Sequence, residues 1–123
     1  MISILILIAC QSKQDKKIET ERTYQKITPE QAKERLEKEE GIILLDVRTE
    51  EEYKEKHIPN SILIPLQDLD KMVEEKISDK DTTIFVYCRS GRRSQSAAEK
   101  LIEMGYENVF DLGGIIDWPY ETE

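Results

Sequence analysis

Two long apolar runs constrain the fold of this chain more than any other feature. Residues 42–47 read Ile-Ile-Leu-Leu-Asp-Val, and residues 82–87 read Thr-Thr-Ile-Phe-Val-Tyr. Neither run alternates apolar with polar residues, so each predicts a strand that is covered on both faces, as in a parallel sheet under helices. Shorter strands are expected at residues 24–27, 61–64 and 108–112, which brings the total to five.

Helical patterns separate these strands. Thr28, Pro29 and Gln31 make a helix start with an N-cap, a proline at the first helical position and a capping-box residue. This helix is expected to reach Glu39, and further helices are expected near residues 49–53, 66–76 and 94–104. The alternation predicts an α/β fold in three layers, with a mostly parallel five-stranded sheet flanked by helices. In such sheets the working site lies at the carboxyl ends of the strands.

Cys88 directly follows the second apolar run, and a cationic loop comes next, before a helix expected from Ser94. The five residues between them are Arg89, Ser90, Gly91, Arg92 and Arg93. A free cysteine titrates at about pH 8.5. The positive end of the helix dipole, the guanidinium groups and N–H groups turned inward at a glycine all favour its thiolate. We therefore interpret Cys88 as a nucleophile and the loop as an anion-binding cradle; the plainer alternative is a core cysteine with solvated arginines.

Four motifs in chain order resemble those of the single-domain rhodanese family, the thiosulfate-type sulfurtransferases. The first is Leu-Asp-Val-Arg at 45–48 with Glu-Glu-Tyr at 51–53, and the second is His-Ile-Pro-Asn-Ser at 57–61. The third, at residues 88–93, matches the loop pattern C-x-x-G-x-R. The fourth is Gly-Gly-Ile at 113–115 followed by Trp118. Each is weak alone, but together they span most of residues 23–120 at a family-like spacing, which implies a rhodanese-like fold.

The resemblance implies a mechanism. Cys88 would attack the outer sulfur of an anionic donor such as thiosulfate, and the resulting persulfide would pass its sulfur to cyanide or to another thiol. The loop N–H groups from Arg89 to Arg93 would hold that sulfur, while the Arg89 and Arg92 side chains attract the donor. Related phosphatases carry one more residue between cysteine and arginine, so this six-residue loop favours sulfur over phosphate. No cofactor is expected, and no His/Cys cluster suggests a metal.

Other residues near the loop are expected to support it. Arg93 should lie across the loop rim or pair with a carboxylate such as Asp46, which ends its strand on the active-site side. Arg48 and Glu52 are expected to form an ion pair that fixes the chain after the second strand. His57 is the single histidine and is interpreted as structural, because a pre-formed thiolate needs no general base.

Two residues depart from the family pattern. Lys56 and Asn60 stand where glycine is common, before the histidine and after the proline. Asparagine tolerates left-handed backbone, so only Lys56 puts the local turn in question. Trp118 is expected in the core rather than stacked on a ligand.

The first ten residues form a separate unit. Residues 2–9 are apolar apart from Ser3 and have the length of a signal-peptide core. Residues 7–10 read Leu-Ile-Ala-Cys, which resembles a bacterial lipobox. Cys10 would then be lipidated and the protein anchored outside the cytoplasm; the alternatives are a strand or disordered end, and a cytoplasmic protein. The positive charges that usually precede such a segment are missing. We therefore expect that the natural N-terminus lies upstream of Met1, or that residues before Met1 have been trimmed. Residues 11–22 are expected to be a polar linker, and residues 23–121 the rhodanese domain.

Charge and cysteine count limit the other functions. With 123 residues and a net charge of −8, the chain has room for one domain and a tail, and nucleic-acid binding is disfavoured. Two cysteines make no disulfide framework, and a Cys10–Cys88 bridge is disfavoured. A monomer is expected. The alternatives to an enzyme acting on small molecules are a persulfide carrier that serves a protein partner without turnover, and a phosphatase.

Overall fold

A sheet of parallel strands runs through the computed structural model, which describes residues 23–123. The strands are β1 (Gln25–Lys26), β2 (Ile43–Asp46), β3 (Ile62–Leu63), β4 (Thr83–Cys88) and β5 (Asn108–Gly114). Their order is β1-β5-β4-β2-β3, and every pairing is parallel. The predicted α/β fold with a five-stranded sheet is confirmed, and the sheet is entirely rather than mostly parallel. The lipobox-like segment, Cys10 and the linker lie outside the described residues and stay predictions.

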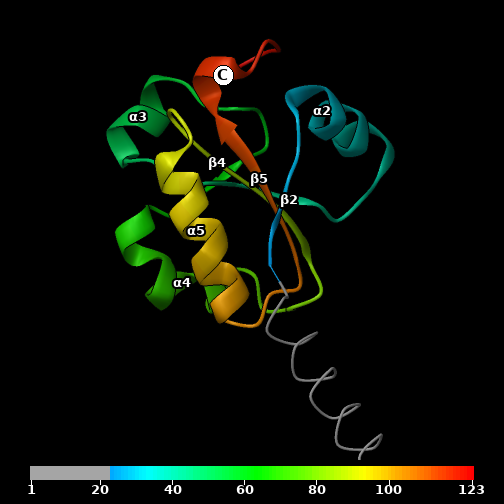
Figure 1. Cartoon of the computed structure of the whole chain (residues 1–123). Helices are drawn as coiled ribbons and strands as arrows, with labels where there is room; N and C mark the ends of the chain where they lie inside the picture. Colours follow the sequence, from blue (N-terminus) through cyan, green and yellow to red (C-terminus); the bar gives the residue numbers. More distant parts are fainter. Residues whose placement is uncertain (1–22) are drawn as a thin grey trace, which may run out of the picture.

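Helices lie on both faces of the sheet (Figure 1). They are α2 (Pro29–Lys38), α3 (Glu50–Glu55), α4 (Leu69–Lys76) and α5 (Arg92–Glu103), with 3₁₀ turns at Leu66–Asp68 and Ile115–Asp117. The α2 helix begins with the predicted capping box. The α5 helix begins two residues before the expected start, because Gly91 rather than a serine precedes its first turn. Within residues 23–123, no helix is long and apolar enough to cross a bilayer.

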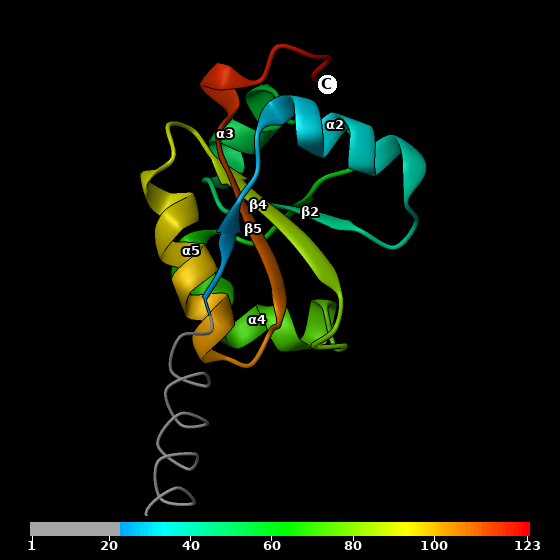
Figure 2. The same ribbon diagram turned by 45° about the vertical axis from the view of Figure 1, so that its right-hand side comes forward.

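The side chains of β4 alternate between two apolar cores. Ile84, Val86 and Cys88 pack on the face covered by α4 and α5. Phe85 and Tyr87 pack on the opposite face with residues of α2 and the C-terminal segment. Figure 2 shows from a second side that α2 and α5 lie on different sides of the strands. Successive residues of a strand point to opposite faces, so a run that is apolar throughout is required where both faces are covered. The thiol therefore belongs to the core on the α5 side.

Residues of α2 pack on the core formed by Phe85 and Tyr87. Ala32 is buried and Leu36 packs partly buried against the same core. The Arg35 guanidinium carbon lies 5.2 Å from the Phe85 ring centroid and 4.9 Å from that of Phe110, so this cation covers two aromatic faces. Trp118 packs against this core as expected.

The turn between α3 and β3 is tied to β4 through the buried phenol of Tyr87. Its hydroxyl accepts a hydrogen bond from the Ile58 amide at 3.1 Å and lies 3.1 Å from the Ser61 hydroxyl oxygen. Asn60 takes the left-handed conformation with φ of 69°, as its residue type allows. Lys56 is extended with φ of −167°. No glycine is needed at this position, so the lysine leaves the turn intact.

Replacing Tyr87 with phenylalanine tests this tie. Tyr87→Phe leaves the Ile58 amide without its acceptor inside the protein, and we expect the free energy of unfolding to fall by about 1–3 kcal/mol. Urea denaturation measures the change. Tyr120→Phe is the matched control, because no hydrogen bond of its hydroxyl is present within the described residues. Equal stability of the two variants would contradict the assigned role.

Candidate active site

The cysteine loop (residues 88–93) curls from the end of β4 into the start of α5. Cys88 is 1% exposed, and its Sγ accepts a hydrogen bond from the Gly91 N–H at 3.0 Å. Gly91 has φ of +108°, a left-handed conformation that side chains rarely adopt. The buried Ser94 hydroxyl donates to the Gly91 carbonyl at 3.1 Å, which holds that turn from the helix side. The thiol thus lies under a backbone N–H at a helix N-terminus.

The end of β5 holds the other side of the cysteine loop. Gly114 pairs with Cys88 in the sheet register. A Cβ atom at position 114 would lie 2.3 Å from the Arg89 carbonyl oxygen and 2.7 Å from the Ser90 Cα, closer than atoms can approach. Two residues on, the Ile116 N–H donates to the same Arg89 carbonyl at 3.3 Å. The loop is therefore seated directly on the backbone of residues 114–116.

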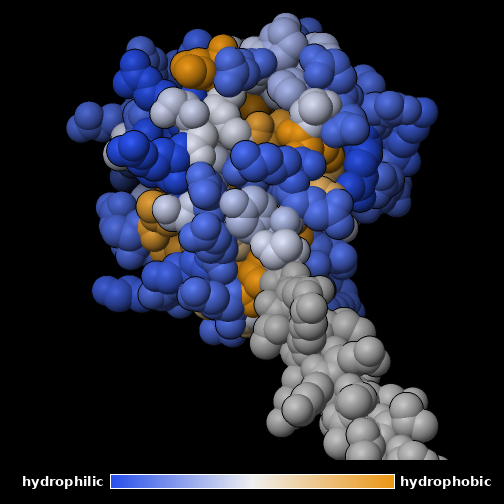
Figure 3. All heavy atoms as spheres, viewed as in Figure 1, coloured by the Kyte–Doolittle hydropathy of each residue, from blue (hydrophilic) through white to orange (hydrophobic). Residues whose placement is uncertain are grey.

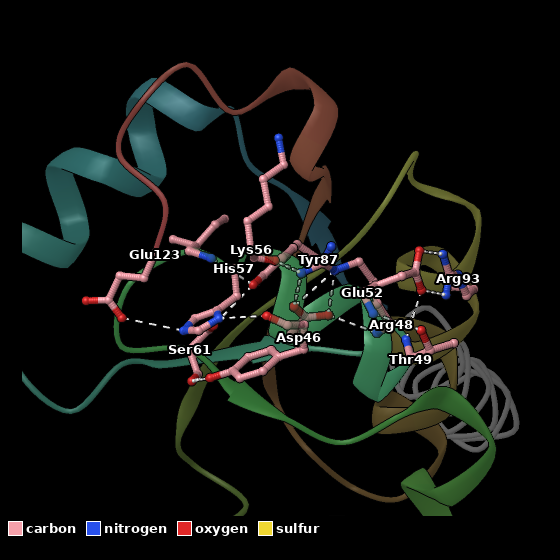
Figure 4. Close-up of polar contacts among 12 residues, drawn as sticks. Asp46, Arg48, Thr49, Glu52, Lys56, His57, Ser61, Tyr87, Arg93 and Glu123 are labelled. Carbon is pink, nitrogen blue, oxygen red and sulfur yellow. Dashed lines mark hydrogen bonds and ion pairs between the residues drawn. The ribbon is translucent and has the colours of Figure 1, made fainter.

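An ion pair joins the cysteine loop to the helix after β2. Arg93 donates from Nη1 and Nη2 to the two carboxylate oxygens of Glu52 at 2.7 and 3.0 Å (Figure 4). Glu52 also completes a capping box, because its carboxylate accepts from the Thr49 N–H at 2.9 Å. The hydrogen bonds from Arg93, and then those with Thr49, lower the pKa of Glu52 from 4.5 to about 2 against the opposing effect of burial. One carboxylate thus fixes the start of both α3 and α5.

The pKa of Arg93 is raised in turn, first by its hydrogen bonds to Glu52. The Coulomb interactions with Cys88 and with Asp46 add to this rise. The guanidinium therefore stays positive near the sulfur.

A second ion pair is buried behind the cysteine loop. The Asp46 carboxylate accepts from the Arg48 backbone N–H at 2.9 Å and from the Arg48 Nη2 at 2.8 Å. Arg48 also donates to the Lys56 carbonyl at 2.7 Å, and its guanidinium carbon lies 5.6 Å from the Tyr87 ring centroid. Figure 4 shows the Asp46–Arg48 pair near Tyr87, the residue that precedes Cys88. Burying two charges is tolerated here because each has hydrogen-bonding partners.

One expected pairing is wrong, and in another the partner differs from the example given. Arg48 pairs with Asp46 and not with Glu52. Arg93 pairs with a carboxylate, as expected, but the carboxylate is that of Glu52 and not that of Asp46. Asp46 is fully buried and takes the nearest guanidinium along its own strand edge, that of Arg48. This leaves Glu52 on the α3 surface that meets α5. The spacing Thr49-x-x-Glu52 is a capping-box signal that could have placed this carboxylate.

The remaining loop residues face outward. Arg89, Ser90 and Arg92 are exposed. A groove of about 580 Å³ borders the loop on the β1 side and includes Ser90, Gly91 and Arg92 in its wall. A second groove of about 260 Å³ borders it on the α3 side and includes Arg89. The structure thus brings all the predicted loop residues to one edge, with cationic side chains in the walls of both grooves.

His57 contacts residues of the fold rather than the loop. Its ring stacks on Tyr53 with centroids 3.8 Å apart, and its Nδ1 lies 2.9 Å from the Tyr53 carbonyl oxygen. Its backbone exchanges two hydrogen bonds with Glu123 at the C-terminus. Over residues 23–123, no group of three or more His, Cys, Asp or Glu side chains is placed to hold a metal ion.

Comparison with known proteins places this geometry in a family. The model of the rhodanese-like domain matches residues 28–120. The chain belongs to the rhodanese-like family. Over 73 residues it is 41% identical to the thiosulfate sulfurtransferase PspE of Escherichia coli (strain K12), covering 59% of this chain and 70% of PspE. The rhodanese-like fold is also seen in the crystal structure of the Alr3790 protein from Anabaena sp., with a TM-score of 0.74, 29% identity, and coverage of 79% of this chain and 90% of that one.

The relatives of this rhodanese-like chain differ in how they are described. YrkF of Bacillus subtilis (strain 168), which is named as a sulfur carrier protein, is 37% identical over 98 residues. That match covers 79% of this chain but only 52% of YrkF. Sulfur transfer in the general sense is common to these relatives, and the chain is a single rhodanese-like domain with homology to thiosulfate sulfurtransferases.

The acid stability of the protein tests the Glu52–Arg93 pair. Because the pKa of Glu52 is lower in the folded chain, about 2 against 4.5, its ionised form stabilises the fold above about pH 4.5, and this contribution is lost as the pH falls towards 2. Glu52→Gln is expected to lower the free energy of unfolding by about 1–2 kcal/mol at pH 7. The difference from the parent chain should vanish near pH 2 in chemical denaturation. Glu51→Gln, at an exposed neighbour, is the control, and a pH-independent difference would contradict the pair's role.

Proposed function

We propose that this protein is a sulfurtransferase that carries sulfane sulfur on Cys88 as a persulfide. The observation that carries the proposal is the Gly91 N–H, which donates to the Cys88 Sγ at 3.0 Å from the N-terminal end of α5. A backbone N–H and the positive end of a helix stabilise negative charge on sulfur. The same groups would stabilise the anion of a persulfide formed there.

The first step would take sulfur from a small anionic donor such as thiosulfate. The Cys88 thiolate attacks the outer sulfur, a new S–S bond forms, and the bond to the sulfonate sulfur breaks with its electron pair leaving on sulfite. In the second step cyanide attacks the outer sulfur of the persulfide and leaves as thiocyanate, which returns the Cys88 thiolate. The charges balance in both steps, and neither step needs a metal or a redox cofactor.

The charge distribution supports an anionic donor. The chain carries a net charge of −8, yet the exposed residues of the cysteine loop include Arg89 and Arg92, and no acidic residue lies within it. Neither of these side chains has an ion-pair partner among residues 23–123. A cationic loop in an acidic protein would raise the local concentration of a dianion.

A persulfide carrier is the second candidate, and the relative named as a sulfur carrier favours it. In this reading Cys88 takes sulfur from one protein and delivers it to another without turnover on small molecules. The burial of Cys88, which is 1% exposed, is compatible with both candidates, because a persulfide extends the reactive sulfur beyond the position of Sγ.

Assays with thiosulfate and cyanide test the enzyme. We expect freshly reduced protein to form thiocyanate, and Cys88→Ser to reduce the rate to background because serine forms no persulfide. Cys10→Ser is the matched control and should keep the activity. Absence of thiocyanate above background from the parent protein would refute the enzymatic proposal.

Intact-mass measurement after thiosulfate treatment separates the two candidates. A gain of one sulfur atom that disappears in Cys88→Ser is expected for both. Negligible thiocyanate production from such a protein favours the carrier. p-Nitrophenyl phosphate should not be hydrolysed, and turnover of this ester would favour a phosphatase instead.

A further inference from the structure

The C-terminal 3₁₀ turn places an apolar side chain beside the cysteine loop. Ile116 is 65% exposed, and no other large hydrophobic residue of 23–123 is exposed to this degree. Figure 3 shows a hydrophobic area at the end of the molecule where the C-terminal segment lies in Figure 1. A single exposed isoleucine is ordinary on a protein surface. Ile116 is distinguished by its position next to the cysteine loop.

That position is fixed relative to the reactive sulfur. The Ile116 N–H donates to the carbonyl of Arg89, the residue after Cys88, at 3.3 Å. The preceding Ile115 is buried and anchors the turn in the core. The backbone that carries the exposed side chain is therefore fixed by its contact with the loop. Binding of a group to this side chain would cost little conformational entropy of the protein.

The groove between this turn and α3 has a definite charge. Its wall consists of Arg48, Glu52, Glu55, Lys56, Arg89, Ile115 and Ile116. Arg48 and Glu52 are neutralised by Asp46 and Arg93. Of the other charged side chains, Lys56 and Arg89 are cationic and Glu55 is anionic, and none of the three has an ion-pair partner among residues 23–123. The groove therefore presents the apolar side chain of Ile116 among charged side chains whose net charge is positive.

We propose that this groove docks the sulfur acceptor, and that the acceptor is a protein segment that carries its cysteine beside apolar and acidic residues. A small dianionic donor would gain nothing from contact with an exposed isoleucine. Protein interfaces, in contrast, usually combine an apolar centre with a polar rim. Complementary charge would speed the encounter. The inference rests on the proposed sulfur transfer at Cys88.

The transfer itself needs no added reagent. The acceptor thiolate attacks the outer sulfur of the Cys88 persulfide anion, and an S–S bond forms between acceptor and outer sulfur. The original S–S bond breaks, and its electron pair stays on Sγ as the Cys88 thiolate. The acceptor leaves as a persulfide anion, so atoms and charge balance. Docking would bring that thiolate to a sulfur that lies at the mouth of a nearly buried site.

Three synthetic peptides test the proposal. Each contains one cysteine; its neighbours are leucine and glutamate in the first, serine and glutamate in the second, and leucine and lysine in the third. Sulfur transfer from persulfidated protein, followed by mass, is expected to be at least about tenfold faster to the first peptide than to the others. Equal rates for the three peptides would overturn the proposal.

Two protein variants separate the contacts. Ile116→Ser should remove most of the advantage of the leucine-glutamate peptide over the serine-glutamate peptide while thiocyanate formation stays within about twofold. Lys56→Glu should reduce the preference for glutamate over lysine, and Lys71→Glu, an exposed lysine on α4, should leave it unchanged. An Ile116→Ser variant that slows cyanide and peptide reactions equally would show a role in holding the loop and contradict docking.

Binding without chemistry keeps this test independent of the proposed function. Fluorescently labelled peptides with serine in place of cysteine are titrated with the unmodified protein, and the leucine-glutamate form should bind several-fold more tightly than the others. Tight and selective binding together with no thiocyanate formation would remove the enzymatic proposal and keep the docking surface. Thiocyanate formation together with unselective peptide binding would keep the enzymatic proposal and remove the docking surface.

Discussion

The cysteine loop depends on the absence of a side chain at position 114. The loop carbonyl of Arg89 and the Cα of Ser90 lie where a Cβ of that residue would be. Because Gly114 is the register partner of Cys88 at the end of the sheet, this contact sets how closely the loop can approach β5. The left-handed Gly91 then turns the chain so that its N–H meets the sulfur. Two glycines thus determine the shape of the cradle.

The charges around the loop work on this fixed backbone. Glu52 binds Arg93 and caps α3 with one carboxylate, so the loop cannot shift without disturbing a second helix. The Asp46–Arg48 pair lies one strand away and fixes the chain that carries Glu52. Preorganised donors and cations stabilise developing negative charge at little reorganisation cost. This is the property that the proposed sulfur transfer through an anionic Cys88 persulfide would require.

Sequence reasoning predicted most of this architecture because the relevant signals are local. The apolar runs that became β2 and β4, the capping box at Thr28 and the glycine in the loop each act over a few residues. The exchange of partners between Arg48 and Arg93 depends on which side chains α3 and α5 bring together, and no short window of sequence contains it.

The role of Gly114 also depends on contacts between residues that are far apart in the sequence. The Gly-Gly pair at 113–114 is visible as a motif, but its contact with Arg89 and Ser90 depends on the register of β5 against β4. Likewise, α5 begins before the expected Ser94 because Gly91 closes its first turn. Long-range packing, and not propensity, decides these details.

The most direct measurement of the central claim is the rate at which thiosulfate persulfidates Cys88 in Gly114→Ala. The backbone at this residue has φ of −105° and ψ of 144°, which alanine adopts freely, so the substitution changes the contact with the loop and not the local backbone preference. A variant with the circular dichroism spectrum of the parent chain and at least a tenfold slower gain of sulfur, by intact mass, is predicted. Persulfidation at the parental rate would contradict the account.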